Sequence, residues 1–74
     1  MRMEMEYTIV IEKAPRNYAA YVPDLPGCVA TGATRDEAIR EIGTAIVLHI
    51  ESLREHGEPV PAPQCTAAVV EVAT

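Results

Sequence analysis

The sequence predicts an α+β domain in which one long helix crosses a three-stranded antiparallel sheet and a further strand ends the chain. Three observations predict this fold class. Residues 5–32 carry apolar alternation interrupted by turn-forming residues, which is typical of antiparallel strands. Residues 35–56 repeat apolar side chains at helical spacing. A valine-rich run, residues 65–74, follows a proline-rich connector. A chain of 74 residues allows a single domain, residues 1–74.

Alternation predicts the first two strands. In "MEYTIVIE" (residues 5–12), the side chains of Tyr7, Ile9 and Ile11 share one side of an extended chain. "YAAYV" (residues 18–22) repeats this pattern. The segment "KAPRN" between them holds a proline and an asparagine, which favour a chain reversal. We therefore expect a hairpin.

The stretch "PDLPG" predicts a tightly defined structural turn after the second strand. Pro23 ends that strand because proline cannot donate to a sheet ladder. Pro26 and Gly27 suit the central positions of a type II turn, in which glycine supplies the positive φ. For Asp24 we expect an Asx-type hydrogen bond to the local backbone. The residues that follow, 28–32, leave room for a short third strand.

A helix is predicted from residue 35 to about residue 56. Thr34 and Glu37 have the spacing of a capping box at its start. Gly57 and then Pro59 stop it. At 1.5 Å per residue, such a helix is about 33 Å long, whereas short strands span about 17–20 Å. We therefore expect the helix to extend past its sheet.

Helical spacing separates a core stripe from two exposed apolar residues. The stripe consists of Ala38, Ile39, Ile42, Ala45, Ile46, Ile50 and Leu53. Val47 and Leu48 fall outside it, among charged residues. Two adjacent apolar side chains on an overhanging helix favour contact with another chain, and so small a domain has limited stability alone. We expect self-association through these two residues, as a homodimer or, next, a dimer of dimers.

The charge balance bears on the class of partner. Eleven acidic and six basic residues give a net charge of −5, and the basic residues are scattered. This predicts no direct nucleic-acid binding, which needs clustered Lys and Arg, and favours a basic protein partner. No segment approaches the ~20 apolar residues of a membrane span. Residues 1–6 lack the apolar run of a secretory signal, and we expect a cytoplasmic location.

The residue types that carry chemistry are few and dispersed. Cys28 has no accompanying oxyanion-stabilising motif, so burial as a small apolar residue is the preferred interpretation. His49 and His56 lie about 10.5 Å apart along the helix axis, too far to share one metal ion. Asp24 has no neighbouring carboxylate. We therefore expect no enzyme activity, no metal and no cofactor.

The segments "YAAYVPDLPGCVATGATRDEAIREIGTAI" and "LREHGEPVPAP" resemble the N-terminal domain of HicB-family antitoxins. The resemblance runs from Tyr7 to about Pro63. It rests on a PDLPGC turn, a T-x-x-E-A helix start and a G-x-P-x-P exit, which occur in that order. It implies a β-β-β-α-β fold, a partial ribonuclease-H-like sheet.

The resemblance also implies a binding function. HicB-like proteins bind HicA, a small basic mRNA-cleaving toxin, and cover its catalytic surface. Four acidic residues are candidate contacts, although a solvated helix face explains each equally well: Glu12, Glu41, Glu51 and Glu55. Many members carry a C-terminal DNA-binding domain, whereas this sequence stops at Thr74, so DNA binding is not carried over. The alternative is an orphan oligomeric domain, structural or ligand-sensing, without a toxin partner.

Overall fold

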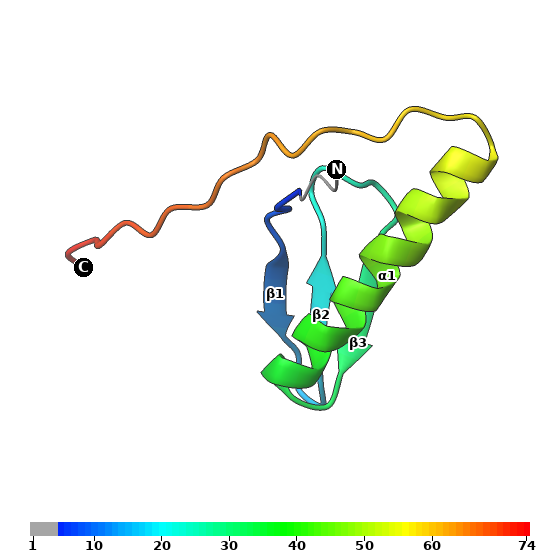
Figure 1. Cartoon of the computed structure of the whole chain (residues 1–74). Coiled ribbons are helices and arrows are strands. Elements are labelled where there is room, and N and C mark those ends of the chain that lie inside the picture. The colour runs from blue at the N-terminus through cyan, green and yellow to red at the C-terminus, as the bar shows by residue number, and fades with distance from the viewer. Residues whose placement is uncertain (1–4) are drawn as a thin grey trace.

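The computed structural model of the chain describes residues 5–74. Residues 1–4, on which the expectation about a secretory signal partly rests, lie outside the described residues. Four elements follow one another along the chain: β1 (Val10–Lys13), β2 (Tyr18–Tyr21), β3 (Val29–Gly32) and α1 (Arg35–Glu55). They form the predicted α+β arrangement, a three-stranded antiparallel sheet with one long helix against it (Figure 1).

The sheet has the order β1-β2-β3, with both neighbouring pairs antiparallel. The loop between β1 and β2 is closed by a hydrogen bond of 2.9 Å from the Ala14 amide to the Asn17 carbonyl oxygen. In the register, Ile11 faces Ala20, and Ala20 faces Ala30. Residues that face one another across strands point to the same side of a sheet. These three therefore mark the side that the helix covers.

Capping interactions define both ends of α1. At its start, the Thr34 hydroxyl accepts a hydrogen bond of 3.1 Å from the Glu37 amide. At its end, Gly57 has a φ of +67°. Its amide donates to the Arg54 carbonyl at 3.1 Å, and the Glu58 amide donates to the Leu53 carbonyl at 2.9 Å. This is the Schellman pattern, which glycine stabilises because it tolerates positive φ.

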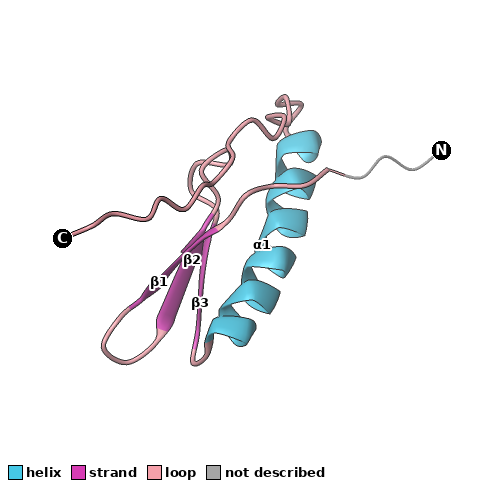
Figure 2. Cartoon of the chain, turned by 90° about the vertical axis from the view of Figure 1, so that its left-hand side faces the viewer, coloured by secondary structure: helices cyan, strands magenta, loops and turns pink. Residues whose placement is uncertain are grey.

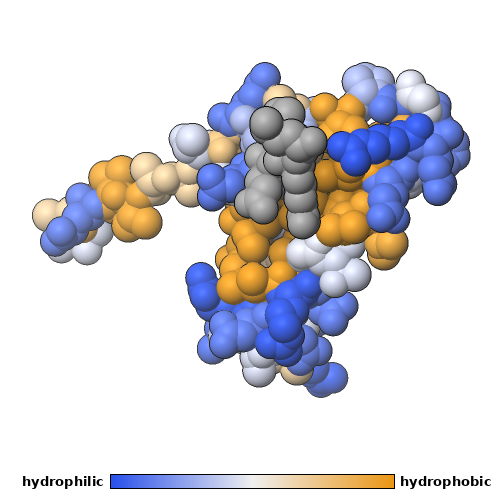
Figure 3. Space-filling view, viewed as in Figure 1, coloured by the Kyte–Doolittle hydropathy of each residue, from blue (hydrophilic) through white to orange (hydrophobic). Residues whose placement is uncertain are grey.

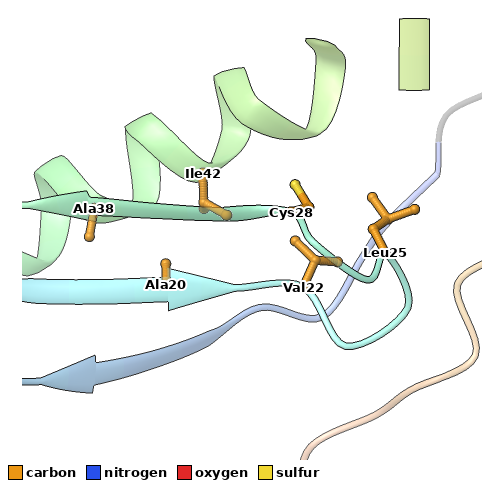
Figure 4. Packing of buried hydrophobic residues seen from close by; sticks show 6 residues of the cluster. All are labelled: Ala20, Val22, Leu25, Cys28, Ala38 and Ile42. Atoms are coloured by element: carbon orange, nitrogen blue, oxygen red, sulfur yellow. The ribbon is translucent and has the colours of Figure 1, made fainter. Parts of the chain in front are cut away.

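The core lies between the sheet and the helix, which packs across one face of all three strands (Figure 2). Its buried side chains come from β2, from the turn that follows it and from the first half of α1. They are Ala20, Val22, Leu25, Cys28, Ala38 and Ile42 (Figure 4). Tyr7, Ile9, Ile11, Tyr18, Ala30, Ala45 and Ile46 are partly buried around them.

The helix extends past the strands, as its length predicts (Figure 1). Its predicted apolar stripe faces the core: Ala38 and Ile42 are buried, and the stripe becomes half-buried toward the C-terminal end, at Ile46, Ile50 and Leu53. Within residues 5–74, no helix combines the length and the apolar character that crossing a membrane requires.

The structure differs from the prediction at the first strand and at the last predicted strand. The first strand begins at Val10 rather than at residue 5, because β2 ends at Tyr21 and offers no further partners. Residues 65–74 form no strand, although one was predicted there. They run extended and exposed, away from the sheet (Figure 1). A strand needs a hydrogen-bonded neighbour, and no strand among residues 5–74 pairs with this run.

Candidate protein interface

Three successive hydrogen bonds close the proline-rich turn between β2 and β3. The Leu25 amide donates to the Val22 carbonyl at 3.1 Å, and the Cys28 amide donates to the Leu25 carbonyl at 3.0 Å. The Val22 amide closes the base by donating to the Cys28 carbonyl at 3.2 Å. Gly27 has a φ of +86°, which other residues adopt only with strain. The turn thereby directs Leu25, which is fully buried, into the core (Figure 4).

Asp24 connects this turn to a distant part of the chain. One carboxylate oxygen, Oδ2, accepts hydrogen bonds from the backbone amides of Gln64, at 3.0 Å, and Cys65, at 2.9 Å. These bonds replace the local Asx-type bond that the sequence predicted. The bond from the Cys65 amide, followed by the bond from the Gln64 amide, lowers the pKa of the Asp24 carboxyl below its ordinary value of 3.8. Such bonds favour the charged form.

Two residues just before β1 also bind the segment that contains Gln64 and Cys65. The Tyr7 hydroxyl donates to the Pro61 carbonyl oxygen, and the Thr8 hydroxyl donates to the Cys65 carbonyl oxygen at 2.7 Å. We refer to Tyr7, Thr8 and Asp24 as the clamp, and to residues 58–65 as the connector. The clamp fixes where the connector crosses the end of the sheet, so the turn serves to position the C-terminal segment.

The clamp should open in acid, and Asp24→Asn should remove this pH response. The pKa of Asp24 is lower in the folded state than in the unfolded state, so its stabilising contribution is complete above 3.8 and is lost as the pH falls through the lower folded-state value. In ¹H–¹⁵N spectra, the amide signals of Gln64 and Cys65 should therefore shift upfield below that pH. In Asp24→Asn they should stay constant. Asp36→Asn, which alters the first turn of α1, is the control and should keep the pH response. If Asp36→Asn also abolishes the pH response, a group other than Asp24 controls the clamp.

The structure shows what surrounds the two thiols and one of the two histidines. Burial raises the pKa of the Cys28 thiol, and a hydrogen bond with the Asp24 carboxylate raises the pKa of the Cys65 thiol. Both shifts disfavour the nucleophilic thiolate. His56 uses Nδ1 in a bond of 2.7 Å with the Ser52 carbonyl oxygen. No group of three or more candidate metal ligands occurs within residues 5–74.

The exposed side of α1 combines acidic and apolar side chains. Glu41, Glu51 and Glu55 are exposed. Val47 and Leu48 lie among them, with 55% and 60% of their surfaces accessible. At 100° per residue, all five fall on the side of α1 that faces away from the sheet. We call these five residues the outer helix face.

Glu12, the fourth predicted contact, does not belong to that face. It is exposed on β1, where its neighbour Ile11 packs against the core. Since successive side chains of a strand point to opposite sides, Glu12 lies on the side of the sheet away from α1. The four predicted glutamates are therefore divided between the two layers of the molecule.

The uncovered side of the sheet holds an apolar row that sequence reasoning did not single out. Val10, Tyr21 and Val29 face one another across the three strands. Val29 is 65% exposed and Tyr21 is 39% exposed, whereas Val10 is half-buried. This row could have been predicted only from the register of the hairpin, because pairing residue 11 with residue 20 places residue 10 opposite residue 21. Alternation within single strands does not show which residues face one another.

Comparisons with known proteins identify relatives over most of the chain. Residues 7–73 match the sequence profile described as "HicB_like antitoxin of bacterial toxin-antitoxin system". UPF0150 protein Ta0767 of Thermoplasma acidophilum is 45% identical over 77% of this chain and 84% of that protein. An uncharacterized 14.9 kDa protein of Haemophilus phage HP1 is 44% identical over 77% of this chain, but only 43% of its own length.

A solved structure is similar as well. A chain of a HicA3 and HicB3 toxin–antitoxin complex superposes with a TM-score of 0.71 at 33% sequence identity. The match covers 81% of this chain and 70% of that chain. At this level of identity, the similarity extends beyond the general fold to the sequence itself.

Proposed function

Because the chain belongs to the HicB-like antitoxin family, we propose that it binds a HicA-like mRNA-cleaving toxin and neutralises it by covering its catalytic surface. The observation that carries this proposal is the similarity to a chain of the HicA3 and HicB3 complex, at a TM-score of 0.71. The net charge of −5 suits a basic partner, since opposite charges accelerate encounter and favour the correct orientation. Toxin and antitoxin would meet in the cytoplasm.

We assign the toxin contact to the outer helix face. Protein interfaces commonly combine an apolar centre with a polar rim. Val47 and Leu48 would supply the centre, and Glu41, Glu51 and Glu55 the rim. In this arrangement the carboxylates face the basic groups with which the toxin holds RNA. A single face cannot hold a toxin and a second copy of the chain at once, so self-association would use another part of the molecule.

Neutralisation of this kind needs no chemistry by the antitoxin. The surroundings of both thiols raise their pKa, which disfavours the nucleophilic thiolate. The acidic surface is unsuited to a phosphate backbone, which would be repelled. The proposed mechanism is therefore occlusion by a preformed surface, without a cofactor and without direct contact to nucleic acid.

Charge reversal on the two layers tests the proposed contact. A HicA-like toxin would be co-expressed with the wild type, with Glu51→Lys or with Glu12→Lys. Wild type should co-purify with the toxin and restore growth. Glu51→Lys should weaken binding at least about tenfold, because an attractive charge becomes repulsive. Glu12→Lys makes the same change on the other layer and should bind within about threefold of wild type.

The other outcomes each identify an alternative. If Glu12→Lys weakens binding while Glu51→Lys does not, the toxin contacts the uncovered side of the sheet. If wild type neither binds nor neutralises the toxin, the antitoxin function is excluded and the orphan domain is favoured.

A further inference from the structure

The last residues of the chain form an exposed apolar arm. We define the arm as residues 66–74, which leave the connector and run away from the sheet (Figures 1 and 2). Val69, Val70 and Val72 are 101%, 77% and 68% exposed. Figure 3 shows apolar side chains gathered on the arm, apart from the apolar surface of the domain. Valine favours strands because it packs well on a pleated surface. The valines of the arm pack against no sheet within the described residues 5–74.

The base of the arm is held in place. The Asp24 carboxylate binds the amide of Cys65, and the Thr8 hydroxyl binds its carbonyl oxygen. Both backbone polar groups of Cys65, the N–H and the C=O, are therefore hydrogen-bonded to side chains of the folded domain. The arm therefore starts from a fixed point beside Thr8, which lies two residues before the start of β1. This point is on the β1 side of the sheet (Figure 1).

The sequence of the arm opposes folding back onto its own sheet. Residues 65–74 include no Gly, Pro, Asn or Asp, the residues that most readily permit a sharp turn. Pairing with β1 of the same chain would require such a turn immediately after Cys65. An arm that stays extended is instead available to another molecule.

The free edge of β1 is the matching acceptor. Among residues 5–74, the order β1-β2-β3 leaves one side of β1 unpaired, and α1 contacts β3 more extensively than β1. Ile9 and Ile11, which point toward the helix layer, are consequently only half-buried. A strand added at this edge would pair with the β1 backbone and cover these two side chains.

We propose that two copies of the chain exchange their arms, each arm adding a fourth strand to the free edge of β1 in the other copy. Alternation places Ala68, Val70 and Val72 on one side of the arm. That side faces the helix layer and covers Ile9 and Ile11 of the second copy. The opposite side carries Glu71, which stays in solvent. The exchange is reciprocal, as a two-fold dimer requires.

Arm exchange supplies the C-terminal strand that the sequence predicts and a single copy lacks. It also leaves the outer helix face free in each copy. The dimer therefore presents two separate surfaces for a toxin, and self-association and toxin binding do not compete.

Sedimentation of the full-length chain with one substitution in the arm tests this proposal. Wild type should be a dimer of about twice 8.0 kDa. Val70→Pro removes an amide donor and a covering side chain from the exchanged strand, and should weaken dimerisation at least about 100-fold. Val70→Thr, which keeps the β-branched shape and the donor, should weaken it far less. Circular dichroism should show the same helix content in all three.

Cross-linking between differently tagged chains identifies the occupant of the β1 edge. One chain would carry Glu12→Cys and the other Glu71→Cys, both with Cys65→Ser; the remaining thiol, Cys28, is buried. A short bismaleimide should join the two tags. A wild-type monomer, a dimer unaffected by Val70→Pro, or a dimer in which the two tags are not joined would each overturn the proposal. Binding of the HicA-like toxin is measured separately, so its failure does not affect this result.

Discussion

Replacing Gly32 with alanine is expected to lower the free energy of unfolding by about 3 kcal/mol. Gly32 ends β3 at the point where the sheet passes under the start of α1. A Cβ atom there would lie 2.5 Å from the Ala38 backbone nitrogen and 2.9 Å from its Cα. These are backbone atoms of the helix, so no side chain can rotate to make room. The helix would have to move away from the sheet, and the buried contacts of Ala38 would be lost.

Gly43→Ala is the control, and it should raise the free energy of unfolding instead of lowering it. Gly43 lies in the middle of α1, and a Cβ atom there meets nothing within 4 Å. Alanine should therefore stabilise the helix by about 0.5–1 kcal/mol through its better helix propensity. Chemical denaturation of both variants provides the comparison. Equal stability of the Gly32 and Gly43 variants would contradict the close packing described for β3 and α1.

Leu25→Ala should cost about 3 kcal/mol of unfolding free energy. Leu25 belongs to the proline-rich turn, yet it is completely buried and is one of the two largest fully buried side chains. Removing it leaves a cavity between the turn and the helix. Globular proteins are stable by only about 5–15 kcal/mol, and a domain of this size lies near the lower end, so a large part of the stability would be lost.

Leu48→Ala provides the matched control for Leu25→Ala. Leu48 is 60% exposed on the outer helix face, so the same truncation should change stability by no more than about 0.5 kcal/mol. Thermal and urea unfolding of the two variants, under the same buffer conditions, would show the difference. A small effect at Leu25 would mean that the turn does not contribute to the core.

Local patterns predicted most of the fold because the physics that creates them is local. The cap at Thr34 and the stop at Gly57 involve only neighbouring backbone groups, and the helix begins and ends within one residue of its prediction. The strand periods also identified β1, β2 and β3, whereas the strand predicted at residues 65–74 is not formed. The C-terminal strand could not be assigned a partner, because valine-rich alternation at residues 65–74 indicates a strand but not which sheet it joins.

The candidate interface depended on contacts between distant residues, which the sequence pattern does not contain. Asp24 was assigned a local turn bond, whereas its carboxylate holds amides 40 and 41 positions later in the chain. Glu12 is a predicted contact together with three helix glutamates, and strand alternation places it on the other layer. The parity of β1, in which Ile11 faces the core, shows this separation.

Inhibition of purified HicA-like toxin by the purified chain tests the central claim, that this protein acts by binding and not by chemistry. RNA cleavage by a fixed amount of toxin would be followed while the chain is added in increasing amounts. We expect cleavage to fall linearly and stop at a stoichiometric ratio, with an identical titration for Cys28→Ser. Toxin that loses activity at far below stoichiometric amounts of the chain, or that remains active at excess, would contradict the account.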